Sequence, residues 1–289
     1  MFENVKEAGK GKSSRVAMVL AGLGAVAILV SAAIALRRGI TPPVSDTPTA
    51  APTGVAQRPP IVSGTMVRIP GGTFRMGSEG GDRDETPIRE RNVAPFELDM
   101  LEVTVAEFEA CVGANQCAPA VRAEGDCNAG KPERRDHPIN CVDHQQAAAY
   151  CRYMGKRLPS EIEWEIAARG TAGRTYPWGE DPPTTQLCWN GDGSELGKGQ
   201  QRTTCVVGTH PKGSTPEGVQ DLAGNVWEWT ASSYCPYDDE NCATELRVLR
   251  GGGFNNSAPG YVRGADRAKD RAATRNNNLG FRCARDLPR

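Results

Sequence analysis

Ten cysteines carry much of the reactive chemistry available to this 289-residue chain, and all of them lie between Cys111 and Cys283. Thiolates can bind a soft metal or exchange electrons, whereas paired cysteines form disulfides. An even count confined to the folded part of a chain is typical of an exported, disulfide-bonded domain, here with five bridges. Short separations suggest three local pairs, although spacing alone does not prove connectivity: Cys111–Cys117, Cys188–Cys205 and Cys235–Cys242.

Other groups that could do chemistry are few or unsuitably spaced. Three histidines are available, and structural or surface roles are favoured for them over metal ligation: His137, His144 and His210. The carboxylates Glu161, Glu163 and Glu165 stand two residues apart, which does not place neighbours on one helical face, so we identify no glycosidase pair. The run Gly251–Gly253 lacks the lysine and the strand-to-helix context of a phosphate loop.

The composition indicates a folded protein that is not a nucleic-acid binder. Hydrophobic residues make up 38% of the chain and charged residues 24%, which is typical of a globular domain. The 33 glycines and 21 prolines favour many turns over a helix bundle. The net charge is −1, and the acidic excess lies in the second half of the chain. Such a surface is a poor docking site for nucleic acid or anionic lipid.

An uncharged segment near the N-terminus predicts a membrane anchor. Residues 16–36 carry no charge, and a helix of that length spans roughly the 30 Å hydrocarbon core of a bilayer. The basic tail, residues 1–15, is expected in the cytoplasm, which makes the protein single-pass in the cell membrane with an extracytoplasmic (periplasmic or extracellular) C-terminal domain. A cleaved signal peptide ending near Ala33–Ala35 is the alternative, but the apolar run is longer than a usual signal core.

The segment 37–65 is predicted to connect this anchor to a folded domain. It contains six prolines among threonine, alanine and serine residues, so it cannot bury a core. A semi-stiff stalk and a disordered tether are both compatible with this composition. The folded domain is then expected at residues 66–289.

The elements of this domain can be placed from local signals. Met66–Gly77 is typical of two strands separated by a Pro-Gly-Gly turn. Capping boxes at Thr104 and Ser160 predict two short helices, the second ending at Gly170, and Asp143 can cap a third over residues 144–154. With many turns between them, these elements predict an irregular, loop-rich α+β domain. Core packing is favoured for four tryptophans: Trp164, Trp178, Trp227 and Trp229.

Six motifs in this domain occur in an order that resembles a known family. They are Met66–Gly77, Gly155–Glu165, Tyr176–Gly179, Gly224–Trp229, Arg250–Gly253 and Asn278–Cys283. The series resembles the formylglycine-generating enzyme, or sulfatase-modifying factor, family over essentially all of residues 66–289. The resemblance implies a variant of the C-type lectin fold. It also implies the family's activity, the oxygen-dependent oxidation of a cysteine in a client sulfatase to formylglycine.

The family's copper site does not carry over to this sequence. In the family, two thiols hold copper in a segment that follows a Gly-Gly-Ser motif, and here the corresponding positions are Asn256 and Tyr261. An amide and a phenol cannot replace a soft thiolate pair for Cu(I), so copper is not expected. Cys235 and Cys242 could approach the same cleft as relocated thiols, but a local disulfide is the favoured interpretation for them.

The resemblance implies two further features. Asp221–Glu228 resembles a calcium loop of the family, in which Asp221 and Glu228 supply carboxylates while Gly224 and Val226 supply carbonyl oxygens. The alternative is that the two carboxylates only cap local backbone N–H groups. The family also implies a disulfide between Cys151 and Cys283.

These observations favour a non-catalytic binding or accessory module. Its extracytoplasmic ligand would be a peptide, a protein or a glycan, held in a cleft near five residues: Asn255, Asn256, Tyr261, Arg263 and Arg267. The alternative is a divergent oxidoreductase of the sulfatase-maturation type, which would act on a protein cysteine with another metal or relocated thiols. A third hypothesis is a structural subunit of a surface assembly.

Overall fold

The structure, a computed structural model, describes residues 64–121, 125–191, 201–239 and 242–288. The predicted cytoplasmic tail, the apolar segment 16–36 and nearly all of the linker lie outside these ranges. Among the described residues, no helix has the length and apolar character needed to cross a membrane.

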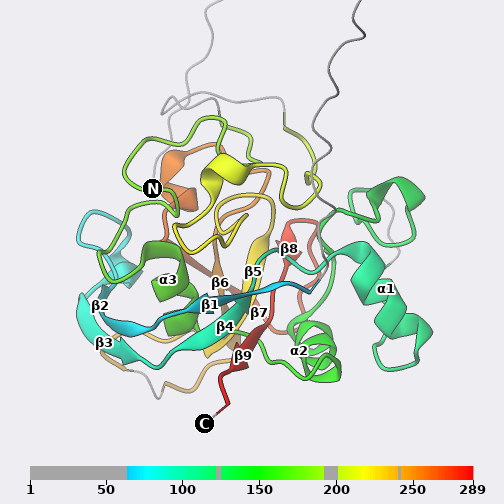
Figure 1. The fold of residues 1–289 in the computed structure, drawn as a ribbon, viewed down its shortest axis with the longest axis horizontal. Coiled ribbons are helices and arrows are strands. Elements are labelled where there is room, and N and C mark those ends of the chain that lie inside the picture. The colour runs from blue at the N-terminus through cyan, green and yellow to red at the C-terminus, as the bar shows by residue number, and fades with distance from the viewer. Residues whose placement is uncertain (1–63, 122–124, 192–200, 240–241, 289) are drawn as a thin grey trace, which may run out of the picture. The chain divides into compact units, whose positions relative to one another are not determined.

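Nine described strands form three sheets (Figure 1). The first sheet is antiparallel and has the order β1 (Met66–Ile69), β4 (Phe96–Asp99), β9 (Ala284–Asp286). The second is the pair β2 (Gly72–Met76) and β3 (Arg89–Val93). The third has the order β7 (Arg267–Arg271), β6 (Leu246–Arg250), β5 (Trp227–Ser233), β8 (Leu279–Gly280), and only its β5–β8 pair is parallel.

The predicted pair of strands around the Pro-Gly-Gly turn is present, but the two strands do not pair with each other. β1 pairs with β4, whereas β2 pairs with β3. Gly71 explains part of this geometry. Its φ is +69°, and a β-carbon there would collide with the carbonyl oxygen of Val93, so only glycine allows the turn to lie against the end of β3.

Three α-helices form where the caps predicted them: α1 (Val105–Gly113), α2 (His144–Tyr153) and α3 (Glu161–Arg169). In each, the cap side chain accepts a hydrogen bond from the third helical residue, and that residue's side chain accepts one from the cap's own N–H. α3 ends at Gly170, as predicted, with a φ of +62°. Four short 3₁₀ segments join the loops: η1 (Arg83–Glu85), η2 (Pro132–Arg134), η3 (Pro211–Gly213) and η4 (Pro259–Val262).

The helices lie on different sides of the central strands in Figure 1. α1 and α2 contact each other, and their apolar faces share a core with Trp229 of β5 and Phe281. α3 contacts both β2–β3 and β5–β6, and its Trp164 is fully buried in a second core. Trp227 is buried as well, whereas Trp178 is half-buried and stacks on Tyr176.

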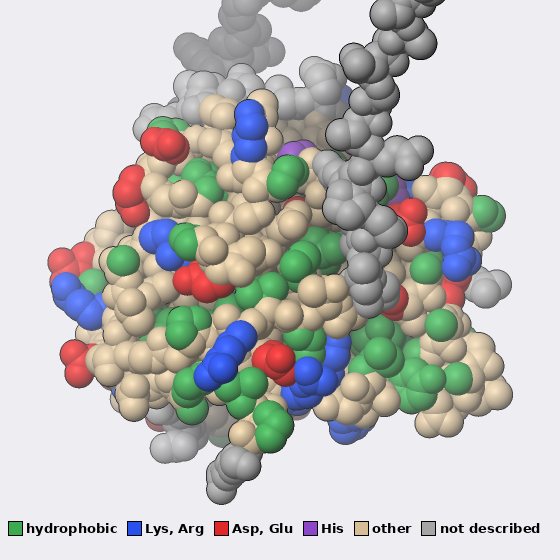
Figure 2. Space-filling model, viewed as in Figure 1, with side chains coloured by type: hydrophobic (Ala, Val, Ile, Leu, Met, Phe, Trp, Pro, Cys, Tyr) green, Lys and Arg blue, Asp and Glu red, His purple; other side chains and the backbone are tan. Residues whose placement is uncertain are grey.

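The expectation of disulfides is confirmed, and all ten cysteines lie in the described part of the chain, where none is free. The structure contains the three local pairs suggested by spacing and the Cys151–Cys283 bridge implied by the resemblance. The fifth bridge joins Cys127 to Cys141. On the face drawn in Figure 2, acidic and basic side chains are interspersed.

Candidate functional site

The segment after β6 contains the residues that stand in place of the family's copper thiols. The amide oxygen of Asn256 accepts hydrogen bonds from the indole N–H of Trp227 (3.0 Å) and from the backbone N–H of Gly253 (2.8 Å). Its own carbonyl accepts from Asn190 N–H at 2.9 Å. Asn256 therefore fixes the turn that connects β6 to η4. Asn255 and Tyr261 are exposed instead, Tyr261 with 48% of its surface.

The two predicted arginines of the cleft have internal partners. The guanidinium of Arg263 forms a two-pronged pair with the buried carboxylate of Glu85, with Nη1 2.9 Å from Oε2 and Nη2 on Oε1. Arg267 is 5% exposed and pairs with Glu161 through Nε and Nη2, both at 2.8 Å. Of the five predicted cleft residues, Asn255 and Tyr261 are thus the ones that offer an exposed side chain, and Arg263 lies at the edge.

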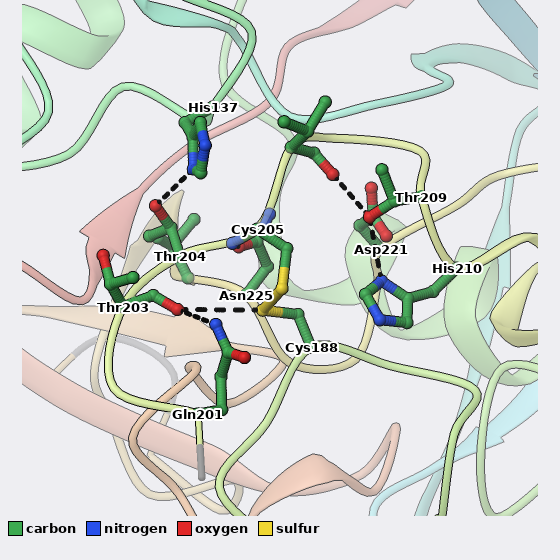
Figure 3. Close-up of a disulfide and its surroundings, with 12 residues drawn as sticks. His137, Cys188, Gln201, Thr203, Thr204, Cys205, Thr209, His210, Asp221 and Asn225 are labelled. Atoms are coloured by element: carbon green, nitrogen blue, oxygen red, sulfur yellow. Dashed lines mark hydrogen bonds between the residues drawn. A yellow bond between two sulfur atoms is a disulfide. The ribbon is translucent and has the colours of Figure 1, made fainter. Parts of the chain in front are cut away.

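The predicted calcium loop, Asp221–Glu228, is buried and tightly bent. Asp221, Gly224 and Asn225 all have positive φ. A β-carbon on Gly224 would lie 2.5 Å from the carbonyl oxygen of Cys188, so the backbone packs directly on the Cys188–Cys205 disulfide. Figure 3 shows Asn225 beside this bridge, where Asn225 N–H donates to the Cys188 carbonyl (2.7 Å) and Cys205 N–H donates to Asn225 Oδ1 (2.9 Å).

The donor groups of this loop fit a hard cation in part. The carbonyl oxygens of Gly224 and Val226 accept no hydrogen bond from any described residue, although both residues are buried. Asp221 accepts from Gly208 N–H at 2.5 Å. The Glu228 carboxylate is engaged differently, because it accepts from Trp164 Nε1 (2.8 Å) and pairs with the buried guanidinium of Arg282 (2.7 Å). Asp221 and two carbonyls therefore remain suited to Ca²⁺.

A third buried carboxylate, which the sequence analysis did not identify, belongs to the same cluster. Glu102 is 1% exposed and accepts from Asn225 Nδ2 (2.6 Å) and Val226 N–H (3.3 Å). Burial, followed by the negative charges of Asp221 and Glu228, raises the pKa of Glu102 well above its usual value, while Arg282 opposes the shift. The cluster thus holds more negative than positive charge.

A cavity of about 320 Å³ lies on the other side of Glu102. Its lining includes four acidic residues: Asp99, Glu102, Glu107 and Asp136. Asp99 is paired with Lys156 at 2.5 Å. None of the five predicted cleft residues lines this cavity, so it is separate from the surface around Tyr261.

A second acidic cluster was also missed from the sequence, and it lies beside Arg263. Asp82, Glu85 and Asp266 each place a carboxylate oxygen within 4.8 Å of the others. Burial, with the negative charge of Glu85, raises the pKa of Asp266 to about 7, although Arg263 and Arg250 oppose the rise. These residues come from η1 and from the segment before β7, far apart in sequence, and each has an ordinary local context. No sequence signal of the kind we used would have joined them.

The chain is similar to known proteins over the whole described domain. Residues 53–287 match the family model described as the sulfatase-modifying factor enzyme 1-like domain. The chain is 34% identical to the inactive C-alpha-formylglycine-generating enzyme 2 of Bos taurus, with 76% of this chain and 87% of that protein aligned. It is equally, 34%, identical to the formylglycine-generating enzyme of Streptomyces coelicolor, with 82% of this chain and 94% of that one aligned.

Solved structures give the same result for the fold. PvdO from Pseudomonas aeruginosa superposes with a TM-score of 0.64 at 27% identity, covering 77% of this chain and 94% of that one. CarF superposes with a TM-score of 0.60 at 19% identity, which shows likeness of fold alone. The sequence relatives include an inactive protein and an active one, so overall similarity does not decide activity, and the residues of the site must.

Proposed function

Because this chain belongs to the sulfatase-modifying factor enzyme 1-like family, we propose that it is a non-catalytic member that binds a peptide, protein or glycan ligand instead of oxidising a cysteine. One observation carries the proposal. The positions of the two copper thiols are Asn256 and Tyr261, and the amide oxygen of Asn256 is already bonded to Trp227 and Gly253. Its likeness to a relative named inactive gives further support.

The residues present do not fit a thiolate copper site. All ten cysteines are consumed by disulfides, including Cys235–Cys242, the pair that could have relocated the site. A disulfide sulfur is not a thiolate and cannot take its place toward Cu(I). We therefore derive no oxidative step, and the divergent-oxidoreductase alternative has no ligand pair among these residues.

The activity test uses the full chain with a cysteine-containing peptide, oxygen and added copper. We expect no aldehyde product above that of the protein-free control, and a count of free thiols by mass spectrometry should be zero. Copper-dependent turnover together with free Cys235 and Cys242 would establish the oxidoreductase alternative in place of the proposal.

The binding surface that we propose centres on Tyr261 and Asn255. Both are exposed, they flank the turn held by Asn256, and an exposed tyrosine provides a rigid ring with a polar tip for contact with a peptide or sugar. Arg263, whose side chain keeps 16% exposure beside Glu85, can add a charged contact at the rim. Arg267 is assigned a supporting role under this surface, because its guanidinium is bonded to Glu161.

Ligand binding can be tested with arrays of defined peptides and glycans, followed by affinity measurements on the best probe. Tyr261→Ala should weaken binding about tenfold or more, as expected for an aromatic residue at the centre of an interface. Tyr153→Ala is the matched control, since Tyr153 is 46% exposed at the end of α2, against 48% for Tyr261. Equal affinities for the two variants would move the site away from Tyr261. A chain that binds no probe and purifies within a large complex would instead support the structural-subunit hypothesis.

We also propose that loop 221–228 holds a calcium ion. The carboxylate of Asp221 and the unbonded carbonyls of Gly224 and Val226 would hold it, and a bound cation would offset the excess negative charge of Glu102 and its neighbours. Since calcium would bind only the folded loop, it should raise the melting temperature of the chelator-treated protein, and Asp221→Asn should reduce that rise.

The cellular placement is part of the proposal. The apolar segment 16–36 and the five disulfides support a single-pass membrane protein whose domain lies outside the cytoplasm. Membrane fractionation combined with protease protection would test it. Cleavage of the domain from the outside of intact cells or spheroplasts is expected, and protection from the outside would contradict this topology.

A further inference from the structure

We infer that Asp82, Glu85 and Asp266 form a second cation site, separate from loop 221–228 and selective for a divalent ion such as calcium. One oxygen from each carboxylate lies within 4.8 Å of the other two. Calcium–oxygen distances are about 2.3–2.6 Å, so two ligands of one ion can stand up to about 5 Å apart. A single ion can therefore reach all three side chains without rearrangement of the backbone.

Asp266 gives the independent evidence for a missing partner. The residue is 3% exposed, yet its carboxylate accepts no hydrogen bond from any described residue. Its ion pair with Arg263 Nη2 is 3.9 Å long, beyond hydrogen-bonding distance. A buried carboxylate is costly unless it is hydrogen-bonded, paired or bound to a metal. Because its oxygen faces those of Asp82 and Glu85, a cation between them would supply that partner.

The local charge balance is consistent with a divalent ion. Three carboxylates face one guanidinium, that of Arg263, which is bonded to Glu85. The neighbouring Arg250 directs its side chain to Glu161 and Glu165 instead. If all three carboxylates are ionised, two negative charges remain uncompensated, which matches the charge of one divalent cation. Donors that are all carboxylate oxygens select a hard ion over a soft one.

The backbone around η1 holds this arrangement in place. Asp82 N–H donates to Glu85 Oε1 at 3.0 Å, and a β-carbon on Gly81 would collide with the Glu85 carboxylate. The loop is thus closed over Glu85, while Asp82 is exposed at its rim. An ion could enter from the solvent side at Asp82 and reach the two buried carboxylates behind it.

The test counts calcium ions on the chelator-treated full chain by equilibrium dialysis. Wild-type protein should bind one ion more than Asp266→Asn, and Asp82→Asn should weaken that same class of site by about tenfold or more. Asp181→Asn, which changes another exposed aspartate outside the cluster, is the control and should bind as wild type does. Circular dichroism in chelator checks that each variant is folded, and Asp82→Asn decides the outcome should the buried variant fail to fold.

Asp221→Asn separates this site from the proposed calcium loop. Loss of one ion in Asp221→Asn and of a different ion in Asp82→Asn supports both sites. Loss only in the Asp82 and Asp266 variants supports this inference and rejects the loop. Wild-type stoichiometry and affinity in both Asp82→Asn and a folded Asp266→Asn would overturn the inference, and it would leave the proposed ligand surface at Tyr261 unaffected.

Discussion

Asn256 holds together three parts of the site through a single side chain and its own carbonyl. The indole of Trp227 and the backbone of Gly253 donate to its amide oxygen, and Asn190 donates to its carbonyl. A thiol at this position could not accept these bonds with the same geometry or strength. The residue that replaces a reactive group has therefore become part of the scaffold that presents Asn255 and Tyr261.

The buried pair Glu228–Arg282 makes a strong prediction for stability. Arg282 is fully buried, and besides Glu228 it donates to the carbonyls of Asp99, Met100 and Gln220. Arg282→Ala leaves the Glu228 charge unpaired, so the free energy of unfolding should fall by about 3–5 kcal/mol in urea titrations. Arg285→Ala is the control. Its pair with Glu97 is half-exposed, and its loss should cost about 0–1 kcal/mol.

Gly224 tests how closely the predicted calcium loop packs on its disulfide. Gly224→Ala combines an unfavourable φ of +81° with a contact of 2.5 Å to the Cys188 carbonyl. Gly218→Ala adds a side chain at a φ of +99° with nothing within 4 Å. Both variants bear a backbone cost of about 1–3 kcal/mol, so the larger loss in Gly224→Ala measures the contact. Equal unfolding free energies would show that the loop relaxes freely.

Local residue patterns predicted part of the site, but distant partners could not be predicted. The short cysteine separations were informative because a chain of seven or eight residues must close a small loop. Glu85 and Arg263 lie 178 residues apart, and Arg267 and Glu161 lie 106 apart. Nothing in the sequence around Arg263 or Arg267 indicates that their guanidinium groups are occupied, so both were assigned to a ligand cleft.

The helices show how far local signals reach at the scale of elements. Thr104, Asp143 and Ser160 each begin a helix at the predicted residue, because a capping box satisfies backbone N–H groups within four residues of chain. The pairing of β1 with β4 and of β2 with β3 depends instead on tertiary packing, which alternation along one strand does not encode.

His144 connects α2 to β5 and makes this contact sensitive to acid. Its Nε2 lies 2.9 Å from the Thr230 carbonyl, and its ring packs edge-on against Trp229. Burial lowers the pKa of His144 below its usual 6.5, and Arg247 adds to the effect, whereas the hydrogen bond to Thr230 and the charge of Asp143 oppose it. The unfolded chain therefore takes up this proton more readily, and stability must fall as the pH drops below about 6.5.

The matching experiment compares unfolding free energies at pH 7.5 and pH 5. Wild-type protein should lose more stability on acidification than His144→Gln, which keeps a donor for Thr230 but does not titrate. His137, whose pKa burial also lowers, contributes equally in both proteins and cancels in the comparison. An identical loss in the two proteins would place the acid sensitivity elsewhere.

The Cys151–Cys283 bridge acts at the scale of the whole molecule. It joins α2 to the segment before β9 and closes a loop of 132 residues, whereas Cys111–Cys117 closes a loop of 6. In the chain-entropy description, the longer loop restricts the unfolded chain by about 2–3 kcal/mol more. Replacing both cysteines of the long bridge by alanine should therefore lower the free energy of unfolding by that much more than the same change in the short bridge, as measured by denaturant titration.

The same bridge has a consequence for how the protein is made. A chain synthesised or exported N-terminus first presents Cys151 long before Cys283, and four other cysteines emerge in the interval between them. During that time a reactive thiol stands beside several wrong partners. We expect maturation of this protein to require correction of mispaired bridges by a thiol–disulfide isomerase, and its yield in a host to follow the capacity of that enzyme more than the rate of synthesis.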